Sequence, residues 1–336
     1  MSTRQHTAFH KFDPDRMLHV VRGGHTEHFL PRPAQCTGEL WRYEHAAADR
    51  SVCLDSGHYQ FEAVVRGTFR PGYVCLGNAV QVAPAHDRPT EINGVRVTDD
   101  HVQVYPEGVE FFYHAQPGTR WTAVQARRED IQATAHTLLG RGVEVSARQV
   151  TNLTIDPHAR AALAAITTTA CQPAYSVLDP ADLDTTDEAF FADVVLEVIA
   201  ELLDLAQRDD AFDEHQIRIH QRLGLVRRAQ DAMRQDIAAP YDSAALCATL
   251  GVPERTLQLA FQRTLAMSPS RWLHTARLHE ARRRLCHADP LRETVAAIAS
   301  CCGLGHAGRF SCNYARLFGE TPSRTLRGSG PTEPRA

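Results

Sequence analysis

The last third of the chain contains the same short pattern twice. "FQRTLAMSPSRWL" begins at Phe261, and "YARLFGETPSRTL" begins 53 positions later at Tyr314. Both copies consist of an aromatic residue, x-Arg-x, Leu or Phe, two further residues, and then Ser/Thr-Pro-Ser-Arg-x-Leu. This repeat limits the possible folds more than any other feature of the sequence, because the chain here must build one small unit twice.

The residues upstream of each copy also repeat, 52 positions apart. Leu246 and Gly251 in the first copy correspond to Ile298 and Gly303 in the second. Each glycine suits a left-handed turn that a larger side chain resists. Each copy is therefore predicted to be a helix-turn-helix, at about 243–264 and about 291–315. The expected cores are Leu246, Val252, Leu257 and Phe261 in one unit, and Ile298, Leu304, Phe310 and Tyr314 in the other.

A further helix is expected to begin after each unit. Ser268 and Thr321 are good N-cap residues, and each is followed by a proline that fits the first helical position. Between the two units, "RWLHTARLHEARRRL" predicts a linker helix. Leu278, Ala281 and Leu285 are expected to face inward, and Arg277, Arg282, Arg283 and Arg284 are expected to lie mostly outside.

Charge is divided unevenly along the chain. Residues 215–328 hold 17 arginines against 8 acidic residues, a net charge of +9, whereas residues 1–214 hold 18 basic against 31 acidic residues, a net charge of −13. This asymmetry predicts that the C-terminal part binds a polyanion, the alternative being a solvated charged face. Candidates for phosphate contacts are Arg263, Arg271, Arg316 and Arg324.

Candidates for reading DNA bases lie on the second helix of each unit. If Leu257 and Phe261 point inward, then Arg255, Gln258 and Gln262 are exposed. Arg and Gln suit bidentate contacts with guanine and adenine edges in the major groove. In the second unit the corresponding candidates are His306, Gly308, Arg309, Ser311 and Cys312.

This region resembles the AraC/XylS transcription regulators, whose members carry two helix-turn-helix units joined by a long helix. The resemblance covers about residues 220–328. It rests on Leu246, Arg255, Leu257, Phe261 and Ser268-Pro269, and on Ile298-Ala299, Gly303, Phe310, Ser311, Tyr314, Phe318-Gly319 and Thr321-Pro322. Three positions depart from the family: Pro253 replaces the usual capping Ser, and Leu259 and Cys312 replace common Arg residues. The "RTLQLAF" segment and the β-rich first part are similar to the ethanolamine-operon regulator branch.

The resemblance implies a sequence-specific transcription regulator, expected to be an activator, and not an enzyme. It implies double-stranded DNA, RNA polymerase, a small organic effector and a second copy of the chain as partners. The alternative is a regulator without a ligand, which acts through protein contacts or through oxidation of the vicinal pair Cys301-Cys302. The chain contains no GxSxG, Walker-type loop or HExxH motif, and no cofactor is expected.

Residues 1–155 have a different pattern. Short apolar or alternating segments bounded by Gly and Pro, such as "HYQFEAVV" and "TRWTAVQA", predict an all-β sandwich or small barrel. The resemblance implies a cupin-like (jelly-roll) sensing domain with an effector pocket. The candidate pocket aromatics are Trp41, Tyr43, Tyr59, Phe61, Tyr73, Phe111, Tyr113 and Trp121. If the ligand is a cationic amine, Glu62 or Glu110 is the expected carboxylate partner.

No metal is expected in this domain. A cupin that binds a metal needs His-x-His before the glutamate of its first motif and a further histidine in its second motif. Tyr59-Gln60 interrupts the first of these motifs and Phe111 occupies the second position.

A helical dimerisation region is expected at 156–212. "DPHARAALAAI" begins with Asp156 as N-cap and a proline at the first helical position. In "EAFFADVVLEVIAELLDLAQR", apolar residues recur at 4-3-4-3 spacing, which is typical of a coiled-coil seam. The alternative is one more helix packed on its own domain. The seam residues are Phe191, Val195, Val198, Leu202 and Leu205.

The predicted fold class is therefore α+β: a β-rich domain at 1–155, a helical linker, and an all-α DNA-binding domain at 215–328. The chain has no apolar run of about 18 residues and no charged-then-apolar leader, so a membrane or secreted location is not expected. The nine cysteines include no CxxC pair, which favours reduced thiols and a cytoplasmic location.

Overall fold

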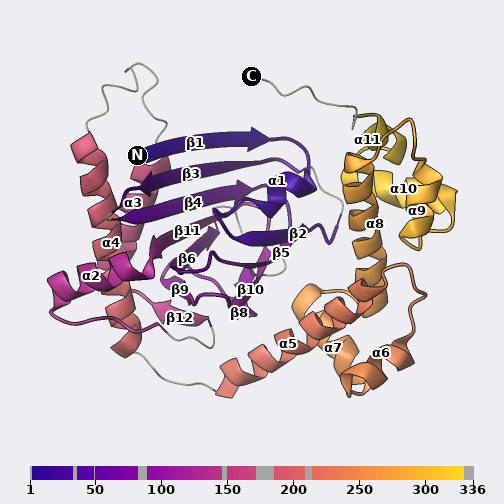
Figure 1. Ribbon diagram of the computed structural model, residues 1–336. Coiled ribbons are helices and arrows are strands. Elements are labelled where there is room, and N and C mark those ends of the chain that lie inside the picture. The colour runs from indigo at the N-terminus through magenta and orange to yellow at the C-terminus, as the bar shows by residue number, and fades with distance from the viewer. Residues whose placement is uncertain are drawn as a thin grey trace.

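The computed structural model describes residues 2–32, 36–48, 50–81, 89–145, 150–171, 185–208 and 214–328. Figure 1 shows a β-rich N-terminal part with helices at one side and a helical C-terminal part at the other. The α+β class is confirmed.

Two antiparallel sheets face each other. The larger has the order β1 (Ser2–Phe9), β3 (Gly38–Ala46), β4 (Ser51–Tyr59), β11 (Thr119–Arg127), β6 (Tyr73–Gln81), β9 (His101–Tyr105) and β12 (Thr151–Thr154). The smaller has the order β2 (His25–Phe29), β5 (Ala63–Thr68), β10 (Glu110–Ala115), β7 (Glu91–Ile92) and β8 (Val95–Arg96). Side chains from both sheets form one buried cluster, which includes Tyr59, Phe69, Tyr105, Phe111 and Trp121.

The predicted strands fall inside these sheets. The segment "TRWTAVQA" lies in β11, and "HYQFEAVV" spans the end of β4, a turn and the start of β5. The alternation of apolar side chains arises because successive residues of a strand point to opposite faces.

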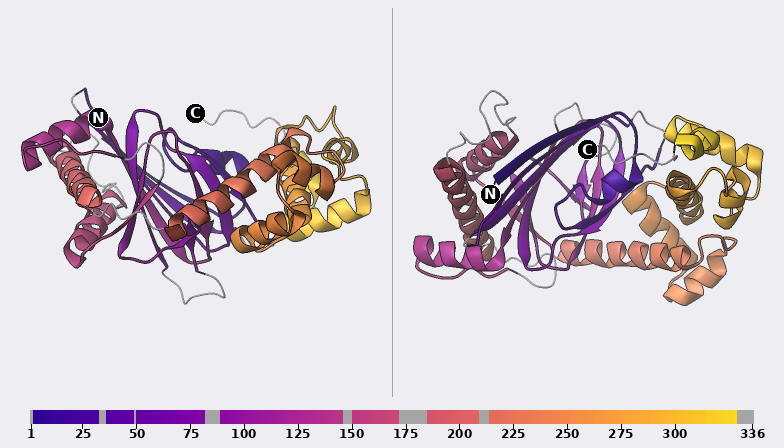
Figure 2. Two further views of the ribbon diagram at one scale, coloured as in Figure 1. Left: turned by 90° about the horizontal axis from the view of Figure 1, so that it is seen from below. Right: turned by 45° about the horizontal axis from the view of Figure 1, so that its top comes forward.

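Three helices cover the outer face of the seven-stranded sheet: α2 (Arg128–Leu139), α3 (Pro157–Cys171) and α4 (Thr185–Arg208) (Figure 2). Asp156 caps α3 as predicted, because its Oδ1 accepts hydrogen bonds from the backbone N–H groups of His158 at 2.9 Å and Ala159 at 2.8 Å.

The seam predicted on α4 packs inside its own domain. Val195 and Leu202 are only 1% and 3% exposed, in a cluster with the outer face of the sheet. Phe191 meets the ring of Tyr43 edge-on at 5.0 Å, and Val198 and Leu205 pack against the same cluster. The prediction that these residues form a dimer seam is therefore wrong. Helix α4 is instead one more helix packed on its own domain, which was the alternative. The outer face of the seven-stranded sheet covers this seam of the helix.

The C-terminal part contains the two predicted units. The helices are α5 (Glu214–Gln235), α6 (Ser243–Leu250), α7 (Glu254–Leu265), α8 (Pro269–His287), α9 (Val295–Cys301), α10 (Ala307–Phe318) and α11 (Pro322–Gly328). Gly251 and Gly303 have φ angles of +66° and +70°. At Gly303 a Cβ atom would lie 2.7 Å from the carbonyl oxygen of Ala238, so both its turn and its close packing require glycine.

The caps that were predicted to open the later helices are present. Ser268 Oγ accepts from the Arg271 N–H at 3.3 Å, and Thr321 Oγ1 accepts from the Arg324 N–H at 3.3 Å. Pro253 precedes α7 and makes no side-chain cap, as its identity requires.

The outward position of the α8 arginines is only partly correct. Arg283 and Arg284 are exposed, but Arg282 is 4% exposed. Arg277 is half-buried, and its Nε donates to the carbonyl oxygen of Ile237 at 2.7 Å. The N-terminal helix α1 (Pro14–Leu18) and helices α9 to α11 pack around α8, so part of its polar face is not in contact with solvent.

Over the described ranges of the chain, every helix is either too short or too polar to cross a membrane.

Candidate DNA interface and buried cavity

Each helix-turn-helix unit is held by the core that the repeat predicted. Leu257 and Phe261 of α7 are fully buried, and Phe310 and Tyr314 of α10 are 2% and 0% exposed. Val252 is the one predicted core residue that is only half-buried. Because one face of α7 and of α10 is buried in this way, the opposite face of each helix is presented outward.

The outward face of α7 carries the predicted polar residues. Arg255, Gln258 and Gln262 are all exposed. Gln258 Nε2 donates to Glu254 Oε1 at 3.1 Å, and Ser243 Oγ donates to the same oxygen at 2.7 Å. This small network orients the Gln258 amide at the start of the helix.

The outward face of α10 carries the second set of predicted residues. His306, Gly308, Arg309 and Cys312 are exposed, and Ser311 is half-buried. A Cβ atom at Gly308 would have no neighbour within 4 Å. The start of α10 is therefore open to solvent around Gly308.

Arginines surround both helices. Arg263, Arg271, Arg316 and Arg324 are exposed. Arg316 Nη2 donates to Asn313 Oδ1 at 3.3 Å. Burial, and then the nearby charge of Arg263, lower the pKa of Arg222. The two guanidinium groups of Arg222 and Arg263 therefore lie close enough to repel each other.

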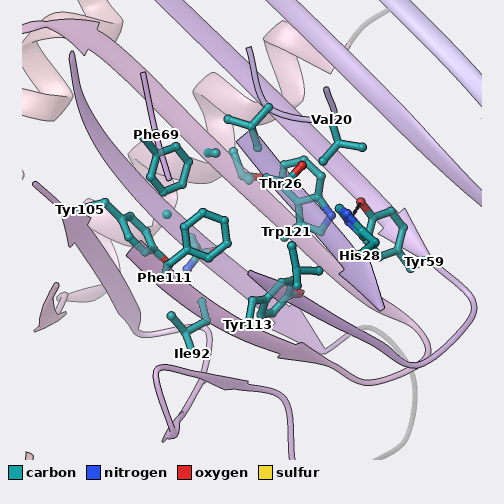
Figure 3. Close-up of a pocket in the computed structure, with 16 residues that line it drawn as sticks. Val20, Thr26, His28, Tyr59, Phe69, Ile92, Tyr105, Phe111, Tyr113 and Trp121 are labelled. Carbon is teal, nitrogen blue, oxygen red and sulfur yellow. Dashed lines mark hydrogen bonds between the residues drawn. The ribbon is translucent and has the colours of Figure 1, made fainter. Parts of the chain in front are cut away.

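A cavity of about 50 Å³ lies between the two sheets of the N-terminal domain (Figure 3). Tyr59, Phe111, Tyr113 and Trp121, all predicted pocket residues, are among its walls. The other lining residues are Val20, Val21, Thr26, His28, Val65, Phe69, Gly77, Asn78, Ile92, Tyr105, Thr122 and Ala123.

Four predicted pocket aromatics lie elsewhere, which corrects that assignment. Trp41 stacks on His6 at 5.1 Å, and Tyr43 is buried beneath α4. Phe61 stacks behind Tyr59, with ring centroids 5.1 Å apart. Tyr73 donates its hydroxyl hydrogen to Ser51 Oγ at 3.0 Å. Strand alternation or the end of a strand places each of these rings away from the cavity.

The predicted carboxylate partners also lie outside the cavity. Glu62 pairs with His114 Nε2 at 2.7 Å and with Arg32 Nε at 3.3 Å. Glu110 pairs with Arg66 at 3.1 Å and with Arg227 at 2.7 Å. Their assignment as partners of an amine ligand is therefore wrong. No three His, Cys, Asp or Glu side chains converge to hold a metal ion within the ranges that the structure describes.

Several wall residues were not anticipated from the sequence. In the short segment "HTEHF", Thr26 and His28 point into the cavity, whereas Glu27 and Phe29 point away from it. The sequence carries little signal here, because the segment has five residues and both inward side chains are polar. Such a short run rarely distinguishes a strand from a loop.

The polar groups of the cavity are uncharged. His28 Nε2 and the Tyr59 hydroxyl lie 3.1 Å apart, and burial lowers the pKa of His28 to about 3. Burial raises the pKa of Tyr113 well above its usual value, so its hydroxyl stays protonated. Over the described ranges, no Asp, Glu, Lys or Arg side chain lines the cavity.

Strands β2, β5 and β10 form a wall with two different faces. The pairing aligns His28 with Val65 and Tyr113, and the next inward row aligns Thr26 with Gly67 and Phe111. These rows face the cavity.

The alternate rows face the C-terminal domain. Phe29 stacks on Trp272 and His279 of α8, at 6.1 Å and 4.9 Å between ring centroids. His279 Nε2 also accepts a hydrogen bond from the Leu30 N–H at 3.0 Å. Arg66 pairs with Asp231 of α5. The five-stranded sheet thus lies between the cavity on one side and helices α5 and α8 on the other.

The structure thus combines a β-sandwich around a small cavity with a helical C-terminal part that contains two helix-turn-helix units. Residues 246–328 match the protein family described as "Helix-turn-helix domain". The chain is 39% identical over 104 residues to the probable thc operon regulatory protein of Rhodococcus erythropolis, which covers 31% of each chain. It is 29% identical over 141 residues to the HTH-type transcriptional activator RhaS of Yersinia pestis (strain Pestoides F), covering 42% of this chain and 47% of that protein.

Similar solved structures include a probable AraC family transcriptional regulator from Rhodopseudomonas palustris. It is 32% identical and covers 32% of this chain and 99% of that chain, with a TM-score of 0.30. ToxT from Vibrio cholerae is 10% identical and covers 97% of this chain and 98% of that chain, with a TM-score of 0.31. Scores of this size do not establish a shared overall fold.

The match of residues 246–328 and the likeness to these regulators confirm the resemblance that the repeat suggested. The chain spans about half the length, or less, of these two curated relatives. The finer resemblance to the ethanolamine-operon branch stays a prediction.

Proposed function

We propose that this protein is a DNA-binding transcription regulator whose N-terminal domain responds to a small organic effector. The observation that carries the proposal is the pair of helix-turn-helix units on one polypeptide, joined by α8, each with a polar outward helix face. Arg255, Gln258 and Gln262 would read bases from α7, and His306, Gly308, Arg309, Ser311 and Cys312 from α10. Arg263, Arg271, Arg316 and Arg324 would contact phosphates.

The N-terminal domain is proposed to be a cupin-like sensor. Its cavity shares a wall with α5 and α8, so a ligand that moves Thr26 or His28 also moves the strand that holds Phe29 against α8. Sensing at residues 1–155 and DNA binding at 215–328 are proposed as separate tasks of two domains in contact. One relative is named a transcriptional activator, which supports activation, with RNA polymerase as a partner.

A thiol-responsive regulator is not favoured. Cys301 is exposed, but Cys302 is fully buried, and burial is the main cause that raises the pKa of Cys302 to about 11. At neutral pH Cys302 is therefore a thiol, which reacts poorly with oxidants and disulfides compared with a thiolate.

DNA binding is tested with two arginine variants. We expect Arg255→Ala to cost about 1–3 kcal/mol of binding free energy on a duplex selected by the wild-type protein, and to relax specificity at one position. Arg263→Ala should weaken binding to selected and scrambled duplexes alike and should flatten the salt dependence, since it would remove a phosphate contact. Fluorescence anisotropy at two salt concentrations measures both effects.

The DNA-binding proposal also sets the length of the binding site. Major grooves on one face of B-DNA recur about every 10–10.5 base pairs. One chain should therefore protect an asymmetric site of about 20 base pairs. If the wild-type protein shows no salt-sensitive binding to any duplex, the two units are scaffolding and the proposal fails.

We propose that the protein forms a homodimer. Because the predicted seam of α4 is buried, the proposed contact lies on the exposed side of this helix. Phe190 is 69% exposed on α4, whereas Val195 is buried. We expect Phe190→Asp to yield monomers in sedimentation at micromolar concentration while the protein stays folded. Glu197→Gln, an exposed change on the same helix, is the control and should leave the oligomeric state unaltered. A Phe190→Asp protein that sediments as wild type does would place any dimer contact elsewhere.

A further inference from the structure

The cavity between the sheets contains buried polar groups without hydrogen-bond partners. Tyr113 is 6% exposed, and its hydroxyl group has no partner. Trp121 is 9% exposed, and its indole N–H points toward the Tyr59 hydroxyl without forming a well-aligned hydrogen bond. Figure 3 shows both side chains at the same cavity. Buried polar groups of folded proteins are usually paired, so these two groups need an explanation.

Both groups are hydrogen-bond donors at neutral pH. The indole N–H can only donate, and the Tyr113 hydroxyl stays protonated because burial raises its pKa. Most of the remaining wall is apolar, with Phe69, Ile92 and Phe111 among the lining residues, while Thr26, His28, Asn78 and Thr122 add polar atoms. A complementary molecule would therefore have an apolar body and one oxygen or nitrogen acceptor.

The cavity also lacks a charge to balance a charged ligand. No charged side chain lines it over the described ranges of the chain, and His28 is neutral because burial lowers its pKa to about 3. The buried carboxylate of Asp55, on β4 of the same sandwich, is paired with Arg42 at 2.6 Å. A carboxylate or an ammonium group without a partner is strongly disfavoured in such a site.

We propose that this cavity binds an uncharged small molecule whose hydrogen-bond acceptor is held by the Tyr113 hydroxyl and the Trp121 indole N–H. This inference rests on the proposed function and specifies the chemical class of the effector. With a volume of about 50 Å³, the cavity must enlarge to admit anything bigger than a few heavy atoms. The aromatic rings between the sheets are the side chains that would move.

Two matched series of probes test the charge and the acceptor. The aliphatic series is propionamide, propionate and propylammonium, and the aromatic series is benzamide, benzoate and benzylammonium, with toluene as the probe without an acceptor. Binding to the full-length protein is measured by calorimetry and by the shift in Tm. We expect an amide to bind, and its charged counterparts of similar shape to bind at least about tenfold more weakly.

Two variants assign the binding to the cavity. Tyr113→Phe should weaken amide binding by about three- to tenfold and leave toluene unaffected, since it removes one neutral hydrogen bond. Tyr43→Phe is the matched control, because the Tyr43 hydroxyl donates to the Glu188 carbonyl oxygen outside the cavity, and it should change nothing. Ala123→Leu fills the cavity and should abolish binding of every probe.

The outcomes separate this inference from the proposed function. If a carboxylate or an ammonium probe binds as well as its amide and Ala123→Leu abolishes that binding, the cavity is a ligand site but the uncharged class is wrong. If no probe binds, or if Ala123→Leu protein still binds the amide, the cavity is not the site, and the effector part of the proposed function fails too. DNA binding of each variant, measured separately, reports whether the C-terminal domain remains folded.

Discussion

Trp272→Ala is expected to destabilise the C-terminal domain by about 3–5 kcal/mol, the usual cost of truncating a fully buried large aromatic residue. Trp272 is 1% exposed at the start of α8. Its ring lies 6.1 Å from that of Phe29 and 6.3 Å from that of Phe261, measured between centroids, and the Arg234 guanidinium lies over it at 5.5 Å. The substitution would therefore leave a cavity at the junction of both domains. Urea denaturation followed by circular dichroism measures the loss.

Trp41→Ala is the control for this prediction. Trp41 is half-buried on β3, where it stacks on His6 and lies below Arg120 at 5.7 Å. Because most of its contacts are with side chains at the surface, its removal should cost about 1 kcal/mol or less. If the two alanine variants lose the same stability, the junction around Trp272 does not hold the domains together.

Arg282→Leu is expected to cost about 3–5 kcal/mol, because it removes one partner of a buried ion pair and leaves the other. Arg282 Nη1 donates to Glu320 Oε1 at 3.0 Å, and its Nη2 donates to the carbonyl oxygen of Phe12 at 2.7 Å. The guanidinium therefore joins α8, the second helix-turn-helix unit and the N-terminal domain. The free energy of unfolding of the variant, obtained from urea denaturation, is the measurement.

The neighbouring Arg283 provides a control with the same change. Its side chain is 56% exposed and pairs with Glu280 on the same helix, so Arg283→Leu should alter stability by less than about 1 kcal/mol. A double-mutant cycle with Glu320→Gln isolates the pairwise energy of Arg282 and Glu320. If Arg282→Leu lowers the free energy of unfolding no more than Arg283→Leu does, the buried ion pair of Arg282 and Glu320 does not stabilise the fold.

The same pair gives a pH dependence. Burial alone would raise the pKa of Glu320, but the hydrogen bond from Lys11 and the charge of Arg282 outweigh burial and lower it. A lowered pKa in the folded state means that the stabilisation is present above the unfolded value, about 4.3, and is lost as the pH falls through the folded value. The stability difference between wild type and Glu320→Gln should therefore shrink in acid.

The sequence alone predicted the C-terminal domain closely. The repeat placed Gly251 and Gly303 at turns, Ser268 and Thr321 at caps, and Phe261 at the centre of a core, all as found. These features are local, because turn, cap and helix face depend on residues a few positions apart. The sequence also predicted the α+β class, since strand and helix periods are read within single segments.

Contacts between distant segments were decided only by the tertiary structure. Arg282 was expected at the surface, but it donates to Phe12, a residue 270 positions earlier in the chain. Helix α4 has a coiled-coil spacing, and yet a sheet face formed by other strands takes up Val195 and Leu202.

The cavity shows the same limit. Half of the predicted pocket aromatics lie outside the cavity. The reason is that an aromatic residue in a strand can lie on either face of its sheet, and its identity does not show which. His28 and Thr26 lie in the cavity because β2 pairs with β5, which begins 34 positions after β2 ends. That pairing fixes which alternate residues face inward, and a shift of one residue would reverse it. The sequence therefore determined the local units, and only packing between distant strands and helices determined which side chains meet.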